Sequence, residues 1–112
     1  MGWPHIDFKK GGAEMMVLAV IEALPRHGYD IARRIDESSG GLLRFHVASL
    51  YPMLYRMERR KWIDGKWIEQ PGRRRRRYYR LTAEGRRVLA SQRRDWRSLI
   101  SALDNVARFS LE

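Results

Sequence analysis

Residues 46–80 read HVASLYPMLYRMERRKWIDGKWIEQPGRRRRRYYR, and this stretch predicts a helix followed by a β-hairpin. In its first part, about 47–60, Leu50, Leu54 and Met57 recur at i, i+4 and i+7 and so share one face of a helix. At about 100° per residue, the opposite face and its flanks carry small, hydroxyl-bearing and basic side chains. These are Ala48, Ser49, Tyr51, Pro52, Tyr55, Arg56 and Arg59. A helix with an apolar back and such a front suits the major groove of DNA.

Pro52 leaves the start of this helix open between two alternatives. A start at Val47 leaves the carbonyl of Ala48 without its amide partner, because proline has no N–H. If Ser49 is the N-cap instead, Pro52 falls at the third helical position and costs nothing. We favour the earlier start, with a mild irregularity at the proline.

The second part of the stretch predicts a two-stranded hairpin. We expect strands over about 62–69 and 74–81, joined by a turn at Pro71-Gly72, because proline presets φ at the second turn position and glycine accepts a positive φ at the third. Asp64-Gly65 is a rival two-residue turn. We rank it second because it would leave strands of two or three residues.

Two further helices are expected before this stretch. Residues 13–24 are apolar nearly all round and predict a buried first helix that Pro25 ends. A tight turn at 27–28 leads into a second helix over about 29–38, and Ser39-Gly40-Gly41 stops it.

A long helix, roughly 40 Å, is expected from Ala83 to about Arg108, with Thr82 as its N-cap. Its apolar side chains repeat near every seven residues, with Gln92 completing the pattern. The stripe consists of Leu89, Trp96, Leu99, Leu103 and Val106. A compact head cannot cover such a stripe along its whole length, so we expect it to be a dimer interface shared with a second copy of the chain.

The fold class expected from these elements is mainly α with a small β-hairpin. The head is a winged helix-turn-helix over residues 13–81, preceded by a flexible arm at 1–12 and followed by a dimerisation helix at 82–112. A dimer would place its two groove helices about one DNA turn, ~34 Å, apart and would read a palindromic operator.

Charge indicates where nucleic acid would bind. The net charge is +10, and residues 56–80 hold eleven Lys/Arg against three Asp/Glu. Concentrated positive charge is typical of phosphate binding. A basic face kept only for solubility is the weaker alternative, because five adjacent arginines repel one another unless something anionic is near. The expected DNA contacts are His46, Ser49, Tyr51, Tyr55, Arg56, Arg73, Arg74, Arg75 and Arg76.

Other roles are open for some of these side chains. Tyr51 is also placed to pack against the hairpin. Arg77 and Arg80 are alternatively partners of Glu69 or Glu58. Tyr78 and Tyr79 alternate faces, so one should be core and the other exposed.

Composition disfavours an enzyme, a metal site and a membrane protein. The chain has no cysteine, and its three histidines show no metal-ligand spacing. No serine has a histidine partner readable in sequence, so we expect neither catalysis nor a cofactor. No apolar run is long enough for a membrane span, and no signal peptide is apparent, which fits a cytoplasmic protein.

Four stretches resemble PadR-type transcriptional regulators. HGYDIARRI (27–35) resembles their second-helix motif, SLYPMLYRMERRKWI (49–63) their recognition helix, and GRRRRRYYRLTAEG (72–85) their wing and its junction with the last helix. The C-terminal segment with Trp96 resembles the short-type dimerisation helix, so the resemblance covers about 13–108. Ser49 stands where the family usually has threonine, and His46-Val47-Ala48 replaces a commoner Ser-Pro-Gly lead-in.

The resemblance implies a homodimeric bacterial repressor, often responsive to small hydrophobic or aromatic compounds. Some relatives bind planar compounds between their C-terminal helices, which makes Trp96 a candidate ligand platform as well as a candidate interface residue. The alternative function is RNA binding or nonspecific nucleic-acid binding. RNA modules usually expose stacking aromatics on a sheet, whereas this chain predicts a groove-facing helix.

Overall fold

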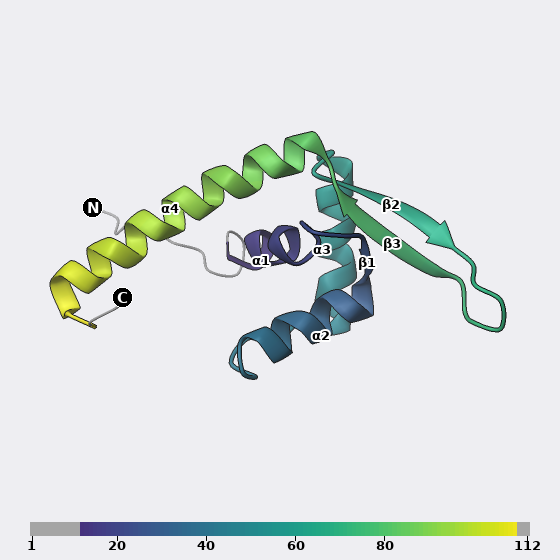
Figure 1. The fold of residues 1–112 in the computed structure, drawn as a ribbon, viewed down its shortest axis with the longest axis horizontal. Helices are drawn as coiled ribbons and strands as arrows, with labels where there is room; N and C mark the ends of the chain where they lie inside the picture. The colour runs from purple at the N-terminus through teal and green to yellow at the C-terminus, as the bar shows by residue number, and fades with distance from the viewer. Residues whose placement is uncertain (1–11, 110–112) are drawn as a thin grey trace.

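The computed structural model describes residues 12–109, which form a mainly helical fold with a small antiparallel sheet, confirming the expected fold class (Figure 1). The elements in chain order are α1 (Ala13–Val20), β1 (Arg26–His27), α2 (Gly28–Ser38), α3 (Val47–Arg59), β2 (Ile63–Ile68), β3 (Arg76–Leu81) and α4 (Ala83–Ala107). Apart from Gly12, the arm predicted for residues 1–12 lies outside the described residues. No helix in the described part is long and apolar enough to cross a bilayer.

The first helix is shorter than predicted, because α1 ends at Val20 and not at Leu24. Ile21 closes the helix and is itself buried in the core. Arg26 Nε donates to the carbonyl of Val20 at 3.0 Å, which satisfies one of the acceptors that a helix end leaves open. The chain therefore turns toward the sheet four residues before Pro25.

The sheet has three strands, in the order β1-β3-β2, where the sequence predicted a two-stranded hairpin. The additional strand pairs Arg26 with Tyr79 and His27 with Tyr78. Two residues are too few to show a strand periodicity, so this pairing was not readable in the sequence.

The hairpin turn is the predicted one. Gly72 has φ +73°, and the Arg73 N–H donates to Gln70 O at 3.0 Å. The rival turn at Asp64-Gly65 is wrong, because Gly65 lies inside β2 opposite Tyr79.

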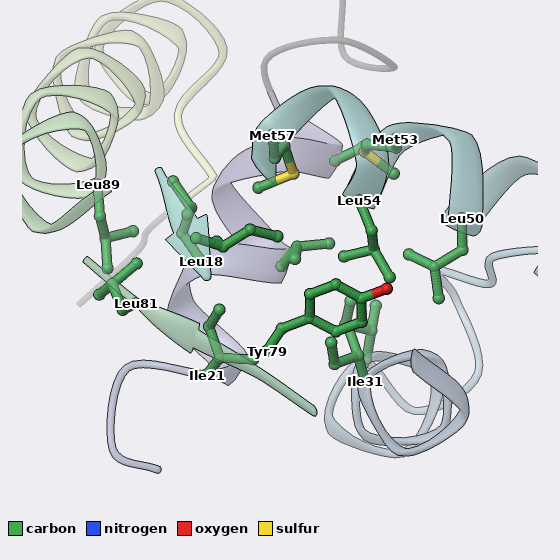
Figure 2. Close-up of a cluster of buried hydrophobic side chains, with 14 residues drawn as sticks. Leu18, Ile21, Ile31, Leu50, Met53, Leu54, Met57, Tyr79, Leu81 and Leu89 are labelled. Atoms are coloured by element: carbon green, nitrogen blue, oxygen red, sulfur yellow. The ribbon is translucent and has the colours of Figure 1, made fainter. Parts of the chain in front are cut away.

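The core lies between α1, α2, α3 and the sheet (Figure 2). The predicted inner face of α3 is confirmed, since Leu50, Leu54 and Met57 are all buried. The helix begins at Val47 after the N-cap His46 and contains Pro52, so the favoured start is confirmed. Of the two adjacent tyrosines, Tyr79 is the core residue.

The long helix α4 starts as expected, because Thr82 Oγ1 accepts from the Gly85 N–H at 2.9 Å. The prediction that Leu89 belongs to the dimer interface is wrong. Leu89 is 1% exposed in the single chain and packs in the head core, so it is not available to a partner. Arg93 then joins α4 to the segment that follows α1, because it donates two hydrogen bonds to the Glu22 carboxylate, at 3.1 and 3.0 Å. Figure 1 shows the rest of α4 running past α1 and away from the hairpin.

Candidate nucleic-acid interface

The outer face of α3 is exposed as predicted, but its side chains divide between two flanks. His46, Ser49 and Arg56 line a hollow of about 460 Å³ beside α1 and the segment that links α2 to α3. Tyr51 and Tyr55 line a separate cleft on the side of the hairpin. The face therefore presents a polar and basic flank and an aromatic flank.

The side chains of the arginine run do not all lie on the same face of the hairpin, because side chains alternate along a strand. Arg75 and Arg77 lie over the ring of Trp67, at 4.8 and 5.6 Å from its centroid. Arg76 points to the other side, where its guanidinium meets His27 at 2.8 Å. Arg73 and Arg74 are exposed near the turn. The hairpin thus carries cations on both of its faces.

The cleft between α3 and the hairpin has a volume of about 460 Å³. Its lining residues are Tyr51, Tyr55, Glu58, Arg59, Trp67, Arg77 and Tyr79. Trp67 is 55% exposed and was not singled out from the sequence, although its place in a strand next to the arginine run was a usable signal. Tyr79 forms the buried floor, and burial raises the pKa of its phenol. Tyr51 borders the cleft, in line with the expected packing toward the hairpin.

Glu58 joins α3 to the hairpin. Its Oε2 accepts from Arg77 at 2.5 Å and from the backbone N–H of Gly65 at 3.3 Å. This confirms one of the expected ion pairs, whereas Arg80 pairs with Asp64, at 3.1 Å, and not with Glu69 or Glu58. Both side chains of the Glu58–Arg77 pair are about one quarter exposed, so the pair is partly shielded from solvent. We infer that it sets the angle between α3 and the hairpin.

Replacing Glu58 with Gln distinguishes this positioning role from simple charge. Removing a carboxylate near a DNA-binding surface should tighten binding if only net charge matters. We expect the opposite: about a fivefold loss of duplex affinity, because the hairpin loses its fixed angle. Glu69→Gln is the matched control, since it removes the same charge from the hairpin and leaves the pair intact. Tighter binding by Glu58→Gln in a fluorescence anisotropy titration would contradict the positioning role.

Among residues 12–109, no three His, Asp or Glu side chains are arranged to hold a metal ion. The exposed side chains of α3 and the hairpin present guanidinium groups, aromatic rings and hydroxyl groups. Such groups bind phosphates through charge-assisted hydrogen bonds and bases through stacking or edge contacts.

Comparisons with known proteins agree with this arrangement. The model of the transcriptional regulator PadR-like family matches residues 17–91, more than half of the chain. The fold resembles a transcriptional regulator from Clostridium thermocellum, with TM-score 0.79, 22% identity and coverage of 92% of this chain and 97% of that one. It also resembles a PadR-like transcriptional regulator from Bacillus cereus, with TM-score 0.77, 24% identity and coverage of 89% and 95%.

A third similar structure is Bacillus subtilis PadR in complex with operator DNA, with TM-score 0.66 and 21% identity. The similarity covers 71% of this chain and 45% of that one. At these identities, the similar structures establish the fold alone. Membership in the family is established by the match of the family model to the sequence. The chain belongs to the PadR-like family of transcriptional regulators, which are not enzymes.

Proposed function

We propose that the protein is a homodimeric, cytoplasmic repressor that binds a palindromic operator in duplex DNA and is released by a small aromatic effector. The observation that carries the proposal is the exposed outer face of α3 beside an exposed basic hairpin. The exposed residues are His46, Ser49, Tyr51, Tyr55 and Arg56 on the helix and Arg73–Arg76 on the hairpin. The fold shared with Bacillus subtilis PadR, whose complex contains operator DNA, supports it.

In this proposal the two flanks of α3 have different roles. Ser49 and Arg56 reach base edges in the major groove, and Arg56 can contact a guanine through two hydrogen bonds. His46, Tyr51 and Tyr55 contact the backbone or bases beside them. The hairpin arginines Arg73–Arg76 contact phosphates or enter the minor groove.

Selection of bound duplexes from a random pool tests the proposal. Recovery of a palindrome with half-sites about one turn apart is the expected result. Competition with single-stranded RNA in rising salt tests the alternative, in which the exposed Trp67 would stack on unpaired bases. Preference for the RNA, or recovery of no common sequence, would overturn sequence-specific duplex recognition.

The salt dependence of binding should come largely from the hairpin. If a dimer contacts on the order of six to ten phosphates, affinity should fall by ~10³ to 10⁵ between 50 and 200 mM salt. We expect the triple substitution of Arg74, Arg75 and Arg76 by Ala to flatten the log–log slope by roughly 0.9 for each phosphate that the hairpin no longer neutralises, with little change in sequence preference. The control replaces three arginines of α4, Arg86, Arg87 and Arg94, and should leave the slope nearly unchanged. An unchanged slope in the hairpin variant would remove the hairpin from DNA binding.

The proposed dimer rests on apolar side chains that the head leaves uncovered. On the outer part of α4, Ile100, Leu103 and Val106 are 46%, 48% and 87% exposed, while Trp96 and Leu99 are half-buried. Ile100 was absent from the predicted stripe. An apolar helix side of this kind is stabilised by burial against a second copy. Two copies joined in this way would set the spacing of their α3 helices.

The effector is proposed to bind near Trp96, where α4 leaves the head. A ligand bound between the two chains changes DNA affinity only by as much as it prefers one spacing of the two α3 helices over another. Planar cationic dyes should quench the fluorescence of the native protein through stacking on this indole. Most of the response should disappear in Trp96→Ala, with Trp3, Trp62 and Trp67 as remaining fluorophores. Equal quenching in both proteins would make Trp96 an interface residue without a ligand role.

A further inference from the structure

His27 links the start of α2 to the hairpin and carries two contacts that compete. Its Nδ1 accepts from the Asp30 N–H at 3.2 Å and so caps α2. Its Nε2 lies 2.8 Å from a guanidinium nitrogen of Arg76. The Tyr78 ring meets the imidazole edge-on, with the centroids 5.4 Å apart, and fixes the ring orientation.

A neutral imidazole has one acceptor nitrogen, whereas the Asp30 N–H and the Arg76 guanidinium are both donors. Burial, followed by the nearby Arg76 charge, lowers the pKa of His27, and Arg33 acts in the same direction against the opposing effect of Asp30. A neutral imidazole accepts at one nitrogen and donates at the other. Nδ1 can accept the amide that caps α2 only in the tautomer that carries its proton on Nε2. In that tautomer the Nε2–H and the Arg76 N–H are two donors directed at the same space.

The surroundings of this space supply further donors. A hollow of about 310 Å³ opens there between the start of α2 and the hairpin. It is lined by His27, Ile68, Gln70, Arg73, Arg74, Arg76 and Tyr78. These lining residues include three arginines and no carboxylate. The nearby carboxylate of Asp30 is paired with Arg26, Arg33 and Arg34, so cations outnumber anions around the hollow.

We propose that this hollow is an oxyanion site that takes a phosphate oxygen of the DNA backbone, held jointly by His27 Nε2–H and the Arg76 guanidinium. An oxygen seated beside both nitrogens, within hydrogen-bond reach of each, accepts from both donors and removes their conflict while the cap of α2 stays in place. The site rests on the proposed DNA binding and extends it to α2, outside both α3 and the arginine run. Because the imidazole is neutral, its contact strengthens binding without adding to the salt slope.

The imidazole tautomer can be measured on the native full-length protein. Long-range ¹H–¹⁵N spectra at pH 7 should show the Nε2–H form of His27, and inorganic phosphate should shift the His27 signals more than those of His46, the N-cap of α3. The Nδ1–H form, or equal shifts at both histidines, would overturn the site. This measurement does not require DNA. If the wild-type protein bound no duplex, the proposed function would be refuted. The anion site would still be tested by the phosphate titration.

Substitutions then test the shared phosphate in duplex binding. His27→Asn keeps a side chain that caps helices well but removes the ring donor. We expect about a tenfold weaker affinity per half-site, equal for all sequences and with an unchanged salt slope. Thermal unfolding close to that of the wild type verifies the fold.

A double-mutant cycle tests whether His27 and Arg76 contact the same phosphate or two different phosphates. The losses caused by His27→Asn and Arg76→Gln should be non-additive, because both residues contact the same oxygen. The matched control is Arg75→Gln, whose guanidinium lies over Trp67 and should combine additively with His27→Asn. An unchanged affinity of His27→Asn, or additive losses with Arg76→Gln, would overturn the proposal.

Discussion

Replacement of Leu103 by Asp is expected to yield a monomer that no longer binds its operator tightly. Leu103 is about half exposed in the single chain and lies in the middle of the apolar side of α4. A carboxylate there would have to be buried against the partner without a charge to pair with, which strongly disfavours association. Without the dimer, the two half-sites are bound independently, and affinity should fall on the order of a hundredfold or more. Sedimentation velocity measures the first effect and anisotropy titration the second.

Ser101→Asp is the control for this substitution. It adds the same charge to an exposed position two residues away, which is about 200° around the helix from Leu103. It should remain dimeric and lose little affinity. A Leu103→Asp protein that sediments as a dimer would show that the copies associate through another surface, and the proposed interface would have to be abandoned.

Gly85→Ala should destabilise the head severely, although alanine is the better helix former. A Cβ at position 85 would lie 2.1 Å from the backbone oxygen of Trp62 and 2.8 Å from Cδ1 of Leu81. The Trp62 oxygen cannot retreat freely, because it accepts from the Thr82 N–H at 3.1 Å. We expect the free energy of unfolding to fall by about 3 kcal/mol, against the ~1 kcal/mol gain that helix propensity alone suggests. The melting temperature should fall by roughly 15 °C.

Gly72→Ala is a useful comparison because its cost has a different origin. Gly72 has φ +73° in the hairpin turn, and nothing lies within 4 Å of an added Cβ. That substitution should cost roughly 1 kcal/mol, from backbone strain alone. Calorimetry at equal protein concentrations compares the two variants. If Gly85→Ala were as stable as the wild type, the close contact between α4 and the start of β2 would not exist in solution.

Features that depend on neighbouring residues in the chain were predictable from the sequence. The inner face of α3 follows from the spacing of Leu50, Leu54 and Met57, and the hairpin turn follows from the backbone preferences of Pro71 and Gly72. Thr82 caps α4 through an amide three residues away. In each case the physical cause acts over one helical turn or one β-turn, and this is the range that a sequence pattern reports.

Contacts between distant residues were decided by the tertiary structure. The Glu58–Arg77 pair was one of several pairings that the sequence left open. The strand at Arg26–His27 is too short to show a pattern, and it exists because β3 offers it a partner. Leu89 continues the apolar repeat of α4 but is buried against the head, since the repeat does not reveal which surface covers each turn.

The same division separates the charge of the binding surface from its geometry. The sequence by itself determined that the basic residues would lie on the end of one helix and on a hairpin, because their number and local order place them there. Only the tertiary structure decided that Arg75 and Arg77 lie over Trp67 while Arg76 faces His27. Alternation along a strand places successive side chains on opposite faces. The neighbours that each side chain meets depend on which other elements pack there, and burial of the common core decides that packing.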